Sequence, residues 1–231
     1  MNNTSVRALS RRDFIRHSGQ FAAVSALAGV TLPHVRAAGS DLIQVVLIGC
    51  GGRGTGAAIE ALSVQNGPIK LVAMADVFPK KIDASLERIK KRFPDFDLPK
   101  ERQFIGFDGY RHAMDLLKPG DVVIMATPPA FRWVHFTLAI EKGLHVFMEK
   151  PVSVDGPTTR RMIELGETAK QKNLKVGVGL MVRHCKGRQE LHQRICDGQI
   201  GEIVAMRAYR MGSGGGTAGP KPDGITELLY Q

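Results

Sequence analysis

The chain has 231 residues, and its hydrophobic fraction of 43% is enough for a packed core and excludes an intrinsically disordered protein. Its net charge is +10, of which +4 lies in residues 1–40, and the rest follows predicted helix faces without the interleaved aromatic residues typical of nucleic-acid binding. We therefore expect no bound nucleic acid. Three cysteines (Cys50, Cys185 and Cys196) form neither a disulfide framework nor a metal-ligand pattern, so we expect no bound metal.

Residues 1–38 resemble an export signal. Residues 10–15 read Ser-Arg-Arg-Asp-Phe-Ile, the pattern of a twin-arginine signal, and a weakly apolar stretch at 21–32 is too short to span a membrane stably. Val35 and Ala37 place cleavage near Ala37/Ala38. The alternative is an amphipathic amino-terminal helix or plain disorder. We expect a periplasmic or secreted protein, exported in folded form and not attached to a membrane after cleavage.

A glycine turn follows the first predicted strand. An apolar run at residues 45–48 leads into Gly49-x-Gly51-x-x-Gly54, and residues 55–62 continue as a helix. This order is the fingerprint of a dinucleotide-binding site: Gly49 permits the sharp turn, Gly51 lets the backbone approach a pyrophosphate, and Gly54 lets the helix pack closely on the strand. The helix N-terminus then faces the phosphates. The alternative is an ordinary tight turn in a glycine-rich chain.

Asp76 is the predicted ribose ligand. It ends a second strand, residues 69–76, and lies 22 residues after Gly54, close to the spacing of a carboxylate that binds the adenosine ribose. A carboxylate there would repel a 2′-phosphate, so NAD is favoured over NADP, a preference that the nearby Arg53 and Lys80 moderate. The alternative role for Asp76 is the N-cap of a helix that begins at Pro79.

The chain then alternates between helix and strand patterns. A parallel strand that ends in Thr127-Pro128 presents those residues to the cofactor side of such a sheet. The alternation predicts an α/β fold, a Rossmann doubly wound parallel sheet over residues 41–155. The expected elements are helices at 79–93, 110–117 and 131–142 (the last closed by Gly143) and strands at 103–107, 121–126 and 145–148.

Lys150 is the candidate catalytic residue. It follows the strand at 145–148, where a substrate hydroxyl would lie beside a bound nicotinamide. An ammonium there can polarise a carbon–oxygen group, and desolvation would favour the neutral amine, which can accept a proton. Glu149 could pair with the cofactor ribose or orient the lysine, and Pro151 fixes the backbone after it. The alternative is an ordinary surface lysine at a strand end.

Three motifs together resemble the glucose–fructose oxidoreductase/inositol dehydrogenase (Gfo/Idh/MocA) family, over about residues 42–211. They are Gly49-x-Gly51-x-x-Gly54, Ala126-Thr127-Pro128-Pro129 and Gly143-x-His145-Val146-x-x-Glu149-Lys150-Pro151. The resemblance implies an NAD(P)-dependent oxidoreductase, and several secreted members carry twin-arginine signals. It also makes His135 a candidate catalytic residue near the nicotinamide, although the spacing is shifted and a histidine on the helix surface is an equal alternative.

Beyond Asp155 the expected organisation changes. We predict a helix at 156–172, a sixth strand at 174–180, a helix at 187–197, and, at 199–210, a turn and a long strand similar to the start of the family's second domain. Arg183 and His184 match residues that line the family's substrate cleft, with a polar cap on the next helix as the alternative. Residues 156–231 would then begin an incomplete α+β domain for substrate binding and dimerisation, which favours a truncated reading frame. The alternatives are a partner chain that supplies the rest and a degenerate protein that binds nucleotide without catalysis.

The sequence thus favours hydride transfer between nicotinamide and a sugar or cyclitol carbon. The alternatives are an NAD-dependent glycoside hydrolase that uses transient oxidation and a nucleotide-binding protein without catalysis. We expect a small carbohydrate substrate and, for a full-length form, a homo-oligomer. The predicted cofactor-binding residues are Gly49, Gly51, Gly52, Arg53, Gly54, Asp76, Thr127, Pro128, Glu149 and Lys150.

Overall fold

The computed structural model describes residues 41–209, 220–221 and 223–226. The predicted signal at 1–38 lies outside these residues, as do residues 210–219 and 227–231. All helices and strands given below belong to the unit Leu42–Gln231. Within the described part of the chain, no helix has the length and apolarity needed to cross a membrane.

Six parallel strands form one sheet in the order β3-β2-β1-β4-β5-β6. The two halves meet at β1, which pairs with β2 on one side and β4 on the other, so the chain reverses its direction of winding there. This order confirms the predicted doubly wound sheet. The strands are β1 Ile43–Ile48, β2 Ile69–Asp76, β3 Gln103–Ile105, β4 Val122–Met125, β5 His145–Met148 and β6 Val176–Val178.

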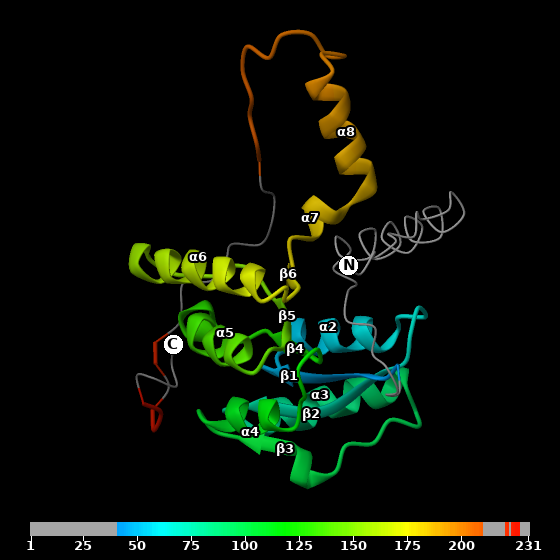
Figure 1. Cartoon of the computed structure of the whole chain (residues 1–231), viewed down its shortest axis with the longest axis vertical. Coiled ribbons are helices and arrows are strands. Elements are labelled where there is room, and N and C mark those ends of the chain that lie inside the picture. Colours follow the sequence, from blue (N-terminus) through cyan, green and yellow to red (C-terminus); the bar gives the residue numbers. More distant parts are fainter. Residues whose placement is uncertain (1–40, 210–219, 222, 227–231) are drawn as a thin grey trace, which may run out of the picture. The chain divides into compact units, whose positions relative to one another are not determined.

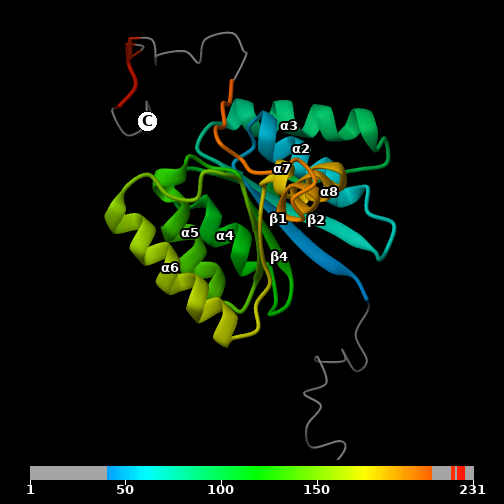
Figure 2. The same ribbon diagram turned by 90° about the horizontal axis from the view of Figure 1, so that it is seen from above.

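Helices cover both faces of the sheet. In Figure 1, and from above in Figure 2, α2 and α3 lie on one face while α4, α5 and α6 lie on the other. Each face has its own core, and β1 supplies both, since Val45 and Leu47 pack under α2 and α3 whereas Val46 and Ile48 pack under α4 and α5. The helices are α2 Gly52–Leu62, α3 Pro79–Arg92, α4 Gly109–Asp115, α5 Arg132–Glu141 and α6 Gly156–Gln171.

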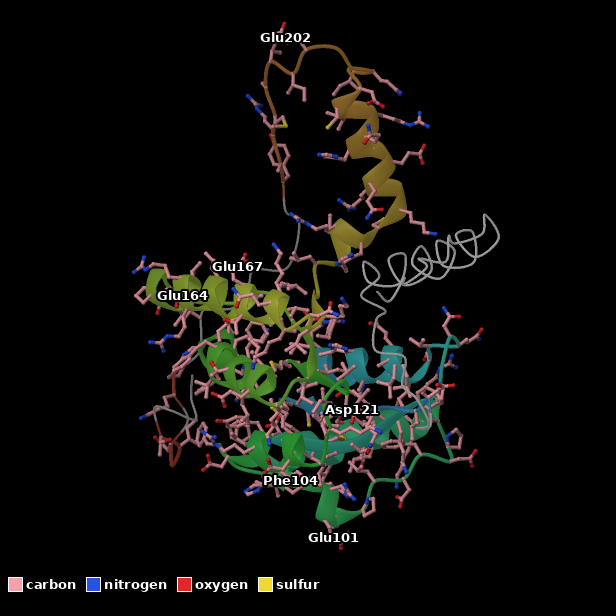
Figure 3. All side chains as sticks on the ribbon, viewed as in Figure 1. Glu101, Phe104, Asp121, Glu164, Glu167 and Glu202 are labelled. Carbon is pink, nitrogen blue, oxygen red and sulfur yellow. The ribbon has the colours of Figure 1, made fainter. Side chains whose placement is uncertain are left out.

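A buried carboxylate joins the amino-terminal ends of the central strands. Asp121, labelled in Figure 3, is fully buried just before β4 and accepts hydrogen bonds from the backbone N–H of Gln44 in β1 and of Lys118. A charged side chain is buried only where such donors satisfy it. Asp121 therefore fixes the edge of the sheet opposite to the one that carries the predicted site.

The sheet continues past Asp155, where the sequence analysis ended the nucleotide-binding domain. The Asp155 side chain caps α6 together with Thr158 in a capping box, and β6 then pairs with β5 in parallel register. β6 is therefore the last strand of this sheet, and α6 is the helix that connects β5 to it. The predicted strand at 174–180 is present but shorter, Val176–Val178, and lies at the end of the strand order, paired with β5 alone.

The segment after β6 differs from the prediction in two elements, a short helix that was not predicted and a predicted strand that is absent from the described residues. α7 Met181–His184 and α8 Lys186–Cys196 follow β6, and neither contains a buried residue. The long strand expected at 199–210 is wrong for the described residues 201–209, which form no sheet pairing and are all exposed. Figure 3 labels Glu202 at the start of this segment. A strand requires a partner for its backbone groups, and none of the described residues provides one here.

Candidate functional site

The predicted motifs meet at the carboxyl-terminal edge of the sheet. In a parallel sheet every strand ends at the same edge, so the residues after β1, β2, β4 and β5 become neighbours. This arrangement brings the glycine turn, Asp76, Thr127 and Glu149 to one side of the molecule, although the first and last of them are about a hundred residues apart in the sequence.

The glycine turn is shaped by contacts that exclude side chains. Gly49 has a φ of +91°, and a Cβ atom there would lie 2.7 Å from the backbone of Ala126 and Thr127. A Cβ at Gly54 would lie 1.9 Å from the Gly49 carbonyl oxygen, whereas a Cβ at Gly51 would meet no atom within 4 Å. Gly49 and Gly54 are thus required by the packing of the protein itself. Gly51 instead leaves open space in front of the N-terminus of α2, as a pyrophosphate requires.

Asp76 holds the two loops beside this turn. Its carboxylate accepts hydrogen bonds from the N–H of Cys50, at 2.7 Å, and of Phe78, at 2.9 Å. Phe78, and not Asp76, is the N-cap of α3, and no side-chain hydrogen bond caps that helix, so the alternative N-cap interpretation is wrong. Each carboxylate oxygen keeps a free lone pair for a ribose hydroxyl.

A cavity of about 510 Å³ opens between the ends of β1, β2 and β4. Aromatic rings and a few polar groups form its walls, and its size and character suit a heteroaromatic ring with a sugar attached. Asp76 supplies a carboxylate to its lining and several aromatic rings supply flat apolar walls, so the adenosine half of a dinucleotide fits the residues present. The lining residues used below are Gly49, Gly51, Asp76, Thr127, Pro128 and His135, with the rings of Phe107, Tyr110 and Phe131.

His135 is buried in this cavity. Its side chain is 7% exposed, its Nδ1 lies 3.3 Å from the Thr127 hydroxyl, and its ring centroid lies 4.3 Å from that of Tyr110. The alternative of a histidine on the helix surface is therefore wrong. Burial, together with the positive charges of Arg132 and Arg111, lowers the pKa of His135 to about 4. His135 shares the cavity with Asp76, whereas Lys150 is not among its lining residues.

Arg132 is a site residue that the sequence analysis missed. It opens α5 and is 1% exposed, and its guanidinium donates to the carbonyl oxygens of Thr127, at 2.6 Å, and of Glu149. These carbonyls follow β4 and β5, so one side chain fixes the ends of both strands. Burial lowers the pKa of Arg132. An arginine at the start of a mostly apolar helix was the available sequence signal.

Glu149 and Lys150 follow β5 in different environments. The Glu149 side chain is buried and forms an ion pair with Arg53 on α2, whereas Lys150 is exposed. The Lys150–Pro151 peptide bond is cis. The strand end thus carries a buried carboxylate next to an exposed amine.

Arg183 and His184 lie on α7, which begins three residues after β6 ends. Both are exposed, and neither lines the cavity. They do not cap α8 with their side chains, because the N-cap of that helix is Cys185 and it has no side-chain cap hydrogen bond. Among the described residues, no cluster of three or more His, Cys, Asp or Glu side chains could hold a metal ion.

Comparison with known proteins identifies relatives among inositol and glucoside dehydrogenases. The chain is 31% identical over 144 residues to the scyllo-inositol 2-dehydrogenase (NADP(+)) IolW of Bacillus subtilis, which covers 62% of this chain and 34% of that protein. It is 28% identical over 171 residues to a glycosyl hydrolase family 109 protein of Shewanella pealeana, which covers 71% of this chain and 34% of that protein.

The fold of this chain is also similar to solved structures of inositol dehydrogenases. The scyllo-inositol dehydrogenase of Lactobacillus casei, with bound NAD(H) and scyllo-inositol, matches with a TM-score of 0.53 and 25% identity, over 71% of this chain and 43% of that one. The chain spans about a third of the length of the curated relatives described above. Residues 43–180 match the model of the oxidoreductase family with an NAD-binding Rossmann fold, so the resemblance seen in the sequence is confirmed and the chain belongs to the Gfo/Idh/MocA family.

Proposed function

We propose that this protein is an NAD-dependent dehydrogenase that oxidises a secondary hydroxyl group of a sugar or cyclitol. The observation that carries this proposal is the joint position of the glycine turn, Asp76 and Glu149-Lys150 at one edge of a single parallel sheet. Dehydrogenases that act on inositol are among its relatives, which supports the substrate class.

Different residues of the site would bind different parts of the dinucleotide. The N-terminus of α2 and the open space at Gly51 suit the pyrophosphate, because unpaired N–H groups and the helix dipole favour an anion there. The Asp76 carboxylate accepts hydrogen bonds from the adenosine ribose, and the aromatic cavity beyond it receives the adenine ring. These roles leave the nicotinamide half toward β5 and Glu149.

Lys150 is the proposed proton acceptor. When bound, NAD supplies the hydride acceptor for oxidation of the carbinol carbon. Lys150 Nζ, in the neutral form that exclusion of water by bound dinucleotide and substrate would favour, takes the hydroxyl proton as the carbon–oxygen bond becomes a carbonyl, and in the reverse direction it returns that proton. Arg132, which donates to the carbonyl oxygen of the buried Glu149, holds the backbone that carries Lys150.

Replacing the lysine tests the proposal. Lys150→Ala should lower the rate of NADH formation from inositols or glucosides by about 10²- to 10⁴-fold, because the hydroxyl proton loses its acceptor. NAD affinity, measured by calorimetric titration, should change little. Lys100→Ala, at another exposed lysine, is the control. Undiminished turnover in Lys150→Ala would show that the catalytic assignment is wrong.

A second candidate is an NAD-dependent glycoside hydrolase that uses transient oxidation. Similarity to two glycosyl hydrolase family 109 proteins of Shewanella favours it. Accumulation of NADH supports the dehydrogenase, whereas release of free sugar from a glycoside without net NADH supports the hydrolase. The two products can be measured in one reaction.

We also propose export by the twin-arginine route and a periplasmic or secreted location. The support is the Ser-Arg-Arg-Asp-Phe-Ile sequence at 10–15. Replacing Arg11 and Arg12 by lysine should keep the protein in the cytoplasm, as measured by cell fractionation.

A homo-oligomer is a further proposal, supported by the exposure of Val204 (91%) and Met206 (84%), and analytical ultracentrifugation tests it.

A further inference from the structure

One ion pair joins the two motifs that a dinucleotide must reach. Arg53, the second residue of α2, donates from Nη2 to Oε1 of Glu149 at 2.5 Å and from Nε to the same oxygen at 3.2 Å. Arg53 belongs to the glycine turn that suits the pyrophosphate, and Glu149 precedes Lys150. The pair therefore spans the distance between the phosphate end and the reacting end of the site.

The two partners differ strongly in burial. The side chain of Glu149 is 7% exposed and that of Arg53 is 64% exposed. The carboxylate rests against Gly179, where a Cβ atom would lie only 2.7 Å from Oε1. Within the described part of the chain, Arg53 is the ion-pair partner of Glu149. A buried carboxylate needs a cation or hydrogen-bond donors, so when Arg53 moves away Glu149 must accept from other donors, at some cost from water or fully from a ligand.

A bound dinucleotide offers that substitute. Its pyrophosphate brings negative charge to the N-terminus of α2, where the exposed guanidinium can form charge-assisted hydrogen bonds with it. Its second ribose brings hydroxyl groups that can donate to Glu149. The number of satisfied charges is the same before and after such an exchange.

We propose that Arg53 is a positioning residue that exchanges Glu149 for the pyrophosphate when the dinucleotide binds, which frees Glu149 for the ribose beside Lys150. This inference rests on the proposed function for the identity of the ligand. Occupancy of the phosphate end is thereby coupled to the arrangement of the reacting end.

The exchange predicts opposite effects of the two partners on ADP, which carries the phosphates but lacks the second ribose. Arg53→Gln should weaken ADP binding about tenfold, the value of one charge-assisted hydrogen bond. Glu149→Gln should strengthen ADP binding about threefold, because the guanidinium no longer has to leave an anion. Glu149→Gln should also reduce the affinity gained from ADP to NAD, since the ribose hydroxyls lose a charged acceptor and keep only the weaker amide oxygen.

Calorimetric titration of the full chain with adenosine, ADP and NAD tests the exchange, using both single variants and the double variant. The double variant should bind ADP as Arg53→Gln does, because the effect of Glu149 acts through Arg53. Adenosine, which has no phosphate, should bind all variants equally. The matched control is the ion pair of Arg194 and Glu190 on α8, also at 2.5 Å, where the same two substitutions should leave ADP binding unchanged.

Several outcomes would overturn the exchange. They are unchanged ADP binding in Glu149→Gln, additive effects in the double variant, and an equal loss of adenosine and ADP binding in Arg53→Gln. If Arg53→Gln does not fold, as judged by circular dichroism, Arg53→Lys takes its place, since lysine keeps the positive charge but lacks the forked guanidinium donors. The ADP affinities of Arg53→Lys, Glu149→Gln and the corresponding double variant are then compared in the same way. An unmodified chain that binds no ADP overturns both proposals, whereas NAD binding without dehydrogenation overturns only the proposed function.

Discussion

His135 is buried in a place where a positive charge is costly. Loss of water and the neighbouring guanidinium groups of Arg132 and Arg111 lower its pKa to about 4, so its imidazole is neutral at neutral pH. A group with so low a pKa is a weak proton acceptor. We infer that His135 orients the Thr127 hydroxyl, 3.3 Å away, and that the proton of the reaction goes to Lys150.

Acid should destabilise the protein through this histidine. The folded-state pKa of about 4 lies below the ordinary 6.5, so the unfolded chain takes up the proton first. Stability that is present above about pH 6.5 is therefore lost as the pH falls toward 4, by roughly 3 kcal/mol. His135→Gln should lose less stability over this range, as measured by urea unfolding, with His192→Gln on α8 as the control. Equal losses in both variants would contradict the prediction.

Asp76 should set the choice between NAD and NADP. Its carboxylate lines the cavity and would lie against the adenosine ribose, where it repels a 2′-phosphate. Asp76→Asn removes the charge, so we expect NAD to bind about tenfold more weakly and NADP to bind no worse. Titration with both cofactors measures this change. Tighter binding of NADP than NAD by the unmodified chain would defeat the argument, and the name of the Bacillus subtilis relative gives NADP(+) for that enzyme.

The glycine turn and α2 form one element in which neighbouring glycines have different tasks. Gly54→Ala should destabilise the fold by several kcal/mol, because its Cβ would lie 1.9 Å from the Gly49 carbonyl and backbone must move. Gly51→Ala meets no protein atom within 4 Å and should fold normally, yet its methyl group would occupy the pyrophosphate space and weaken NAD binding. Thermal unfolding and NAD titration of both variants separate the two effects. Similar behaviour of the two variants would contradict these roles.

The strands and helices were predictable because burial leaves a clear pattern in the sequence. β2 and β5 have the predicted bounds, Ile69–Asp76 and His145–Met148, since buried parallel strands are continuous apolar runs. The segment at 201–209 has a similar apolar pattern but no sheet pairing. Its pattern records a preference for a strand, and pairing depends on a partner that the local sequence does not contain.

The contacts of the site were much less predictable than its motifs. The glycine turn, Asp76 and Lys150 belong to local patterns whose spacing indicates their chemistry. Arg132 depends instead on two carbonyl groups brought together by β4 and β5, and the partner of Arg53 lies 96 residues away. Likewise, His135 is buried because α4 places Tyr110 against it, and neither helix alone reveals that contact.

At the scale of the whole molecule, one edge of the sheet is held by the fold and the other is left for ligands. At the amino-terminal edge, the Asp121 carboxylate accepts hydrogen bonds from backbone N–H groups, so these groups need no ligand. At the carboxyl-terminal edge, the cavity and the open space at Gly51 remain between the loops. Binding of NAD there should join loops from both halves of the sheet, so it should stabilise the folded chain as a unit.

Thermal unfolding with and without NAD measures this stabilisation. A ligand that binds only the folded state at 100 times its dissociation constant raises the free energy of unfolding by about 2.7 kcal/mol. The midpoint should therefore rise by roughly 5–10 °C for a domain of this size. Lys150→Ala should keep the full shift, because Lys150 is exposed and does not line the cavity, whereas Gly51→Ala at the same NAD concentration should lose most of it. A shift that disappears in Lys150→Ala but persists in Gly51→Ala would mean that the dinucleotide lies elsewhere.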